Sequence, residues 1–311
     1  MKKEIIYSMK GPFRDEMRVT GFKFGKGEKS ACIVGAIRGN EIQQLYVCSQ
    51  LIKVLKELEH KGAINSDNEI LVIPSVNSYS MNIGRRFWSG DESDINRVFP
   101  GDVNGEATER IAAGIFEKTQ GYSYGIQFAS FYRPGDFVPH IRMMETGFQS
   151  PSLANLFGMP YIVIRKPKPY DTTTLNYNWQ LWKTNAFSVY TKETDEIDEK
   201  SAKQAVAAVL RFLTRMGIIK YNSHGGYIAS VIAEEDLMPI CAHKAGIYRR
   251  YKLAGDEIAR GEVLADIIDP YDGKVLEEIV APVEGVIFFS HKAPLVNQNE
   301  IVYEIIKRFH E

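Results

Sequence analysis

Residues 30–41 read SACIVGAIRGNE, an apolar run that breaks at a glycine-bearing turn and ends in polar and charged side chains. The run is almost continuously apolar, which is typical of a central strand covered on both faces. Gly35 and Gly39 permit a tight turn or the close approach of another backbone. Ligands of open α/β sheets bind beyond the carboxyl ends of the strands. We therefore expect a functional loop here, with Arg38 and Glu41 in it.

The residues after this turn predict a helix and then a second strand. Apolar side chains recur at three- and four-residue steps over 42–58, and Gly62 ends the pattern, as in an amphipathic helix. Residues 69–74 (EILVIP) form a second buried run, so a right-handed parallel crossover is expected. The alternative for the turn is that Arg38 and Glu41 form only an i,i+3 surface pair at the start of the helix.

The pattern of the chain changes near residue 222. Before that point helical and strand-like segments alternate, with helices expected over 107–118 and 201–216 and further strands over 122–131, 161–165 and 186–190. After it, short apolar segments are separated by glycine turns and show no helical period, which indicates a small all-β domain. We expect two domains, over 1–222 and 223–311.

Composition excludes several classes of protein. The 311 residues are 44% hydrophobic and 25% charged with a formal net charge of -1, an ordinary globular composition that gives no reason to expect nucleic acid or an anionic membrane as partner. The N-terminal segment lacks the apolar core of a signal peptide, and no run approaches the length of a membrane span, so a cytoplasmic protein is expected. Three scattered cysteines without C-x-x-C spacing argue against a disulfide framework or a thiolate zinc site.

Residues 75–102 form a long polar and aromatic stretch without periodicity, and a loop of this length in a compact domain is usually functional. Three arginines and an asparagine in it are suited to binding a carboxylate or phosphate: Arg85, Arg86, Arg97 and Asn96. Alternatively, these arginines pair with the acidic residues of the same loop, Asp91, Glu92 and Asp94.

His140 and Arg142 lie in a second apolar context, in the segment FVPHIR at 137–142. A lone histidine of this kind is more often a structural residue with its hydrogen bonds satisfied than a ligand. The pair nevertheless belongs among the candidate site residues, because a phrase around it recurs in a known family.

Three phrases carry that resemblance: DINRVFPG at 94–101, PHIR at 139–142 and APVEGVI at 281–287. With the strand and turn at 30–41 they resemble the succinylglutamate desuccinylase and aspartoacylase family, relatives of the zinc carboxypeptidases, over almost the whole chain. The resemblance implies an α/β domain with a mixed, largely parallel sheet and helices on both faces, followed by a small C-terminal all-β domain with a lipoyl-like phrase.

The departures from the family pattern fall on the metal site. The family motif G-x-H-G-x-E supplies a histidine and a glutamate to zinc, and this sequence has Arg38 at the histidine position and Glu41 at the glutamate. Phe128, or a neighbour within one residue, stands at the second histidine, and Tyr190 at the catalytic glutamate. Of six histidines only His60 and His140 lie in the expected α/β domain. No metal is therefore expected; if one binds, Glu41 and His140 are the candidate ligands.

Two functions follow from this resemblance. The first is metal-assisted hydrolysis of an N-acyl amino acid or similar small amide with an eroded metal site, and the second is a metal-free, non-catalytic binder of a small carboxylate, a pseudoenzyme. Glu41, Arg38 and Tyr190 occupy the catalytic positions in both cases. Candidate contacts to a ligand carboxylate are Asn96, Arg97, Arg85, Arg86, His140 and Arg142. No cofactor is expected, or zinc if the metal site persists in altered form, and assembly into a homo-oligomer is left open.

Overall fold

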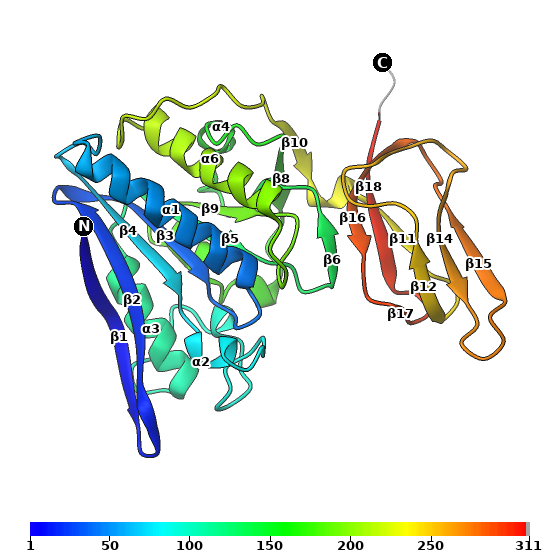
Figure 1. Ribbon diagram of the computed structural model, residues 1–311, viewed down its shortest axis with the longest axis horizontal. Coiled ribbons are helices and arrows are strands. Elements are labelled where there is room, and N and C mark those ends of the chain that lie inside the picture. Colours follow the sequence, from blue (N-terminus) through cyan, green and yellow to red (C-terminus); the bar gives the residue numbers. More distant parts are fainter. Residues whose placement is uncertain (309–311) are drawn as a thin grey trace. The chain divides into compact units, whose positions relative to one another are not determined.

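The computed structural model describes residues 1–308 and divides the chain into two compact units (Figure 1). The first unit comprises residues 1–130 and 139–231, and the second comprises 131–138 and 232–311. The domain boundary that the sequence predicts at residue 222 stays a prediction. No helix within the described part of the chain is long and apolar enough to cross a membrane.

A nine-stranded mixed sheet forms the centre of the first unit. Its strands lie in the order β1 (Lys2–Gly11), β2 (Arg14–Gly25), β4 (Asn68–Ser75), β3 (Glu28–Ala36), β5 (Tyr124–Ala129), β9 (Asn185–Tyr190), β7 (His140–Met144), β8 (Tyr161–Arg165) and β10 (Ser230–Ala233). The central strands β4, β3, β5 and β9 are parallel, as are β7 and β8, whereas β7 runs antiparallel to β9. The expected crossover from β3 to β4 is present.

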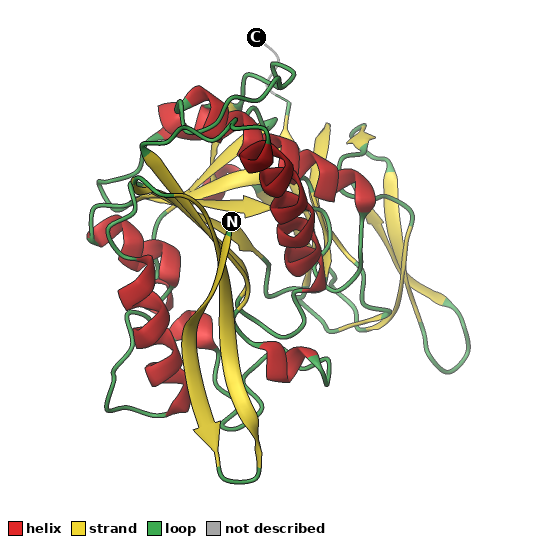
Figure 2. Ribbon diagram, turned by 60° about the vertical axis from the view of Figure 1, so that its left-hand side comes forward, coloured by secondary structure: helices red, strands yellow, loops and turns green. Residues whose placement is uncertain are grey.

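Helices cover both faces of this sheet (Figure 2). One face packs against α1 (Ile42–His60), α4 (Pro151–Asn155) and α6 (Glu199–Arg215), and the other against α3 (Ala107–Thr119) and α5 (Leu175–Leu181). In α1, the buried residues Val47, Leu51, Leu55 and Leu58 follow the spacing that the sequence predicts for one helical face. The mixed α/β architecture is therefore confirmed.

The long loop between β4 and α3 is anchored by its aromatic residues. Trp88 and Phe99 are buried in the same apolar cluster as α3 and α5, and Tyr79 stacks on Trp88. The loop contains the short helix α2 (Ser78–Met81) and the 3-10 turn η1 (Ile95–Arg97). The backbone N–H of Phe99 donates to the carbonyl of Thr173 (2.9 Å), which fastens the loop to the segment before α5.

The second unit is built from strands in two small sheets. One contains β11 (Met238–Cys241), β18 (Ile301–Lys307), β16 (Gly285–His291) and β13 (Glu257–Ile258), and the other contains β15 (Val275–Val280), β14 (Val263–Ile268), β12 (Gly246–Arg250) and β17 (Leu295–Val296). Apart from the 3-10 turn η3 (Glu234–Asp236) it has no helix within the described residues. A strand that the sequence did not predict, β6 (Gly135–Phe137), pairs with β16 and so belongs to this unit.

Candidate active site

Strand order brings the candidate residues of the first unit to one edge of its sheet. The parallel strands β3, β5 and β9 end at Ala36, Ala129 and Tyr190, and the antiparallel strand β7 begins at His140, which is paired with Tyr190. Turns at the carboxyl ends of parallel strands meet at the same edge, which is where open α/β sheets bind ligands.

The turn between β3 and α1 directs the side chain of Glu41 inward. One carboxylate oxygen accepts hydrogen bonds from the backbone N–H groups of Ile37 (2.8 Å) and Arg38 (2.9 Å). The other accepts from Arg38 Nη1 (3.2 Å) and from the hydroxyl of Ser130, at the end of β5. Glu41 is fully buried and Arg38 is 3% exposed, so the two form a buried ion pair and the alternative of a surface pair is wrong.

Arg38 also binds a second carboxylate, that of Asp94. Its Nε lies 3.0 Å from each carboxylate oxygen of Asp94, and its Nη2 lies 2.9 Å from one of them. The guanidinium therefore bridges the turn after β3 to the DINRVFPG phrase. Because Asp94 belongs to the long loop, this contact brings the loop to the same crevice as Glu41.

Asn96 and Arg97 hold the loop against the segment that precedes α5. The side-chain oxygen of Asn96 accepts from the backbone N–H of Leu175 (3.2 Å). Arg97 forms an ion pair with the buried carboxylate of Asp171 (3.1 Å) and donates to the backbone carbonyl of Tyr170. Both residues thus have structural contacts, and the carboxylate partner of Arg97 lies outside its own loop.

Arg165 extends this arrangement from the end of β8. Its Nη2 lies 3.1 Å from Asp171 and donates to the hydroxyl of Tyr170 (2.9 Å). Asp171 therefore lies between two arginines, Arg97 and Arg165, each of which also contacts Tyr170.

His140, Arg142 and Tyr190 form a second buried group at the sheet edge. The rings of His140 and Tyr190 are stacked, with centroids 4.8 Å apart and planes 3° from parallel, and Arg142 Cζ lies 4.9 Å from the centroid of the Tyr190 ring. Ile141 and Met143, which alternate with them along β7, pack in the cluster of α1 and α6. Successive strand residues point to opposite faces, so His140 and Arg142 lie on the other face of the sheet.

Arg85 and Arg86 make different contacts in the long loop. Arg85 is exposed and pairs with Glu92 of its own loop (3.0 Å), as the alternative interpretation of the loop expected for this residue. Arg86 is half-buried, and its backbone carbonyl accepts from the N–H of Gly39 (3.0 Å), which holds the loop against the turn after β3.

Phe128 does not face the site. Its side chain is buried in the core cluster of α1 and α6 together with Ile126, so by strand alternation Gln127 and Ala129 face the opposite side. The sequence places Phe128 or a neighbour within one residue at a ligand position, and this burial favours a neighbour over Phe128 itself. Its neighbour Ala129, within the one-residue margin, is the residue on the site side, and Ser130 follows it.

Sequence reasoning missed Ser130, Asp94 and Asp171 as site residues. Ser130 follows directly on the apolar run of β5, which is a signal of the same kind as the polar turn after β3. Asp94 opens the phrase that was singled out for Asn96 and Arg97. Asp171 carries no comparable signal, because its role depends on Arg97 and Arg165, which are distant in sequence.

The residues present do not fit a zinc ion. Zinc is bound by histidine, cysteine or carboxylate side chains, usually with three protein ligands in catalytic sites. Both oxygens of Glu41 are occupied by hydrogen-bond donors, and the cationic guanidinium of Arg38 lies 3.2 Å from one of them. Within residues 1–308, no three histidine, cysteine or acidic side chains are grouped closely enough to hold a metal ion.

The buried cysteines of this unit are poor nucleophiles. Cys32 lies within β3 and Cys48 within α1, and both are fully buried. Burial raises the pKa of both thiols well above the usual range, because the thiolate would lose its hydration. They act as small apolar side chains.

The chain is similar to proteins of one enzyme family. The model of the succinylglutamate desuccinylase/aspartoacylase catalytic domain matches residues 28–216. The N-alpha-acetyl-L-2,4-diaminobutyric acid deacetylase of Halomonas elongata is 31% identical over 94 residues, which are 30% of this chain and 25% of the deacetylase. The match thus spans about a quarter of the length of this curated relative.

Solved structures share the fold across nearly the full chain. A succinylglutamate desuccinylase from Silicibacter superposes with a TM-score of 0.77 at 17% identity, covering 97% of this chain and 92% of its own. The ectoine utilization protein EutE from Ruegeria pomeroyi, in a product-bound structure, superposes with a TM-score of 0.75 at 18% identity. This match covers 93% of the present chain and 89% of EutE. From the extent of the family match, this chain belongs to the succinylglutamate desuccinylase/aspartoacylase family.

Proposed function

We propose that this chain binds a small carboxylate-bearing ligand of the N-acyl amino acid class at the carboxyl edge of its sheet, without metal-dependent hydrolysis. The observation that carries the proposal is the guanidinium of Arg38, which bridges the carboxylates of Glu41 and Asp94. The ligand class is drawn from the family and from the named activity of the Halomonas relative.

Arg38 balances charge but does not supply the chemistry of a metal. A buried carboxylate without a cation is costly, and a planar guanidinium with five donors can serve two carboxylates at once. It cannot generate a hydroxide nucleophile as a bound zinc ion does. Glu41 already accepts four hydrogen bonds, so it has little capacity left to take a proton from an attacking water.

Arg142 is the best candidate for the contact to the ligand carboxylate. It is 6% exposed, lies against the Tyr190 ring and shares its face of the sheet with His140. A guanidinium matches the two oxygens of a carboxylate, and a partly dry environment strengthens the contact. Arg97, whose guanidinium contacts Asp171 and Tyr170, is a second candidate.

Calorimetric titration of the metal-free protein tests the binding. The probes are N-acetyl-2,4-diaminobutyrate, N-acetylaspartate and N-succinylglutamate, each paired with the analogue in which the α-carboxylate is an amide. We expect at least one acid to bind and its amide to bind at least about tenfold more weakly, since a charge-assisted hydrogen bond contributes about 1.5–3 kcal/mol. Arg142→Lys should weaken binding of the acid by a similar factor, because lysine keeps the positive charge but lacks the planar guanidinium that binds both carboxylate oxygens.

The second candidate is hydrolysis of the same ligands, which family membership favours. Release of amine from the three probes, measured with added zinc and again with a chelator, separates the two functions. Hydrolysis that zinc supports and the chelator abolishes would overturn the proposal. Binding without release of amine supports it, whereas no binding of any of the three acids contradicts the proposed ligand class.

A further inference from the structure

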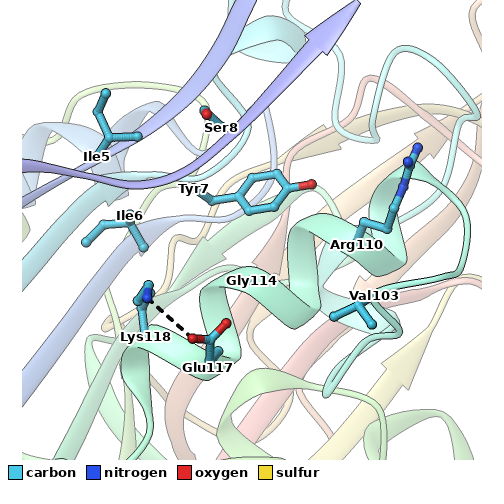
Figure 3. Close-up of a pocket in the computed structure, with 9 residues that line it drawn as sticks. All are labelled: Ile5, Ile6, Tyr7, Ser8, Val103, Arg110, Gly114, Glu117 and Lys118. Atoms are coloured by element: carbon cyan, nitrogen blue, oxygen red, sulfur yellow. Dashed lines mark hydrogen bonds and ion pairs between the residues drawn. The ribbon is translucent and has the colours of Figure 1, made fainter.

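The structure points to a second binding site in the first unit, between the edge strand β1 and helix α3 (Figure 3). We propose that this groove takes a small organic anion, with its charged group at Tyr7 and Arg110 and its apolar part against Val103. The cavity has a volume of about 410 Å³, within the range of small-molecule sites.

A β-bulge aims Tyr7 into this groove. The pairing of β1 with β2 shifts register between Ile5 and Tyr7, which leaves Ile6 as the extra residue. Ile6 is buried in the cluster that includes α3, and Tyr7 packs against the same cluster, so two successive residues lie on one face of the strand. In a regular strand they would point to opposite faces. Bulges often re-aim a side chain in this way.

A glycine in the middle of α3 provides the space for the Tyr7 ring. Gly114 lies inside a regular helix, where glycine is less favourable than any residue except proline. A Cβ at this position would lie 2.3 Å from Cδ2 and 2.8 Å from Cε2 of Tyr7. The backbone of Gly114 is therefore the floor of the groove. A residue with a side chain at this position would clash with the Tyr7 ring, which explains a glycine inside the helix.

The polar groups of the groove are mainly hydrogen-bond donors. The Tyr7 ring crosses α3 with its hydroxyl toward Arg110 (Figure 3), and among residues 1–308 neither the hydroxyl nor the guanidinium has a hydrogen-bond partner. Burial raises the pKa of Tyr7 and the nearby Arg110 opposes the rise, so at neutral pH the hydroxyl keeps its proton and can donate. The one carboxylate in the lining, Glu117, is paired with Lys118 (3.3 Å).

An apolar side chain beside these donors is left in water. Val103 is 70% exposed and lines the cavity. Two donors beside uncovered apolar surface match a ligand that has an anionic head and a short apolar body. A cationic ligand would meet Arg110 without a free carboxylate to balance it.

NMR of the full chain with fluorinated tyrosine tests the proposal directly at the groove. The Tyr7 resonance is assigned by its loss in Tyr7→Phe. The probes are hexyl phosphate and hexanoate, with hexylammonium as the matched cation and inorganic phosphate as the anion without an apolar part. We expect saturable shifts of the Tyr7 resonance with hexyl phosphate, hexanoate or both, and whichever binds more tightly identifies the preferred head group.

The variants separate a specific site from general adsorption. Arg110→Gln should weaken binding of the anion at least about tenfold, since a charged donor is lost. The control Arg260→Gln removes an exposed arginine of the second unit and should leave the affinity unchanged. Gly114→Ala places a methyl group under the Tyr7 ring and should also weaken binding. An equal shift with hexylammonium, an unchanged affinity in Arg110→Gln, or no saturable shift with either anion would each overturn the proposal. Arg142→Lys, which acts at the other site, should leave these shifts in place.

Discussion

Replacement of Arg38 by methionine should destabilise the first unit by several kcal/mol. Methionine has a similar length and no charge, so the change removes the guanidinium that Glu41 and Asp94 share. Glu41 is fully buried and the Asp94 side chain is 8% exposed, so water can replace the lost donors only in part. Two carboxylates would then lie in the crevice without a cation.

The contacts that remain limit the cost. Glu41 keeps two backbone N–H donors and the Ser130 hydroxyl, and Asp94 keeps the backbone N–H of Asn96 (3.0 Å). Removing one partner of a buried ion pair costs about 3–5 kcal/mol, and because of these donors we expect the lower half of that range. Against a typical free energy of unfolding of about 5–15 kcal/mol this is a large effect.

Tryptophan fluorescence during urea denaturation measures this loss where it occurs. The chain has three tryptophans, Trp88, Trp179 and Trp182, and all belong to the first unit. Arg85→Met is the matched control, because it breaks an exposed arginine–glutamate pair and should cost about 0–1 kcal/mol.

A triple variant shows whether the uncompensated carboxylate charges cause the loss of stability. Adding Glu41→Gln and Asp94→Asn to Arg38→Met removes both carboxylate charges and should recover about half of the loss or more. The reasoning is refuted if the free energy of unfolding of Arg38→Met lies within about 1 kcal/mol of that of the unmodified protein, or if the triple variant is no more stable than the single one.

Two further outcomes are expected. Burial lowers the pKa of His291 from 6.5, so below that pH the unfolded chain takes up a proton that the folded chain does not. Calorimetry should show stability falling as the pH decreases below 6.5, by at most about 1.4 kcal/mol per pH unit for this group, and a smaller slope in His291→Phe. The double variant Arg38→His with Ala129→His should retain stoichiometric zinc after dialysis. The double variant Arg38→His with Phe128→His should not, because Phe128 faces the core. Equal zinc contents in the two variants would contradict this orientation.

Local patterns in the sequence predict most of the first unit. The buried strand at 30–36, the amphipathic helix after it and the strand at 69–74 are found as β3, α1 and β4, because hydrophobic periodicity reflects the burial of each element. The all-β character of the chain beyond 231 is visible in the same way. Strand β6 is not, because three residues in a loop gain their strand conformation only by pairing with β16, which is distant in sequence.

The site is predicted less completely than the fold, and the reason is again the separation of its partners along the chain. The pairing of Arg38 with Glu41 is local and could be predicted from an i,i+3 spacing. The contact of Arg38 with Asp94 depends on how a long loop folds back, and that of Arg97 with Asp171 joins residues 74 positions apart. The choice between Phe128 and its neighbours depends on strand parity, since a shift of one residue moves a side chain to the opposite face.

The geometry of Arg38 explains how Glu41 persists in a site without zinc ligands. Lysine at this position could place one ammonium near one carboxylate, whereas the guanidinium gives Nη1 to Glu41 and Nε and Nη2 to Asp94. Loss of the arginine therefore leaves two buried negative charges without a cation, and loss of Glu41 leaves the buried N–H groups of Ile37 and Arg38 without their acceptor. A retained glutamate in the family motif is then explained by stability alone. It follows that Glu41 by itself is no evidence of catalysis in this chain.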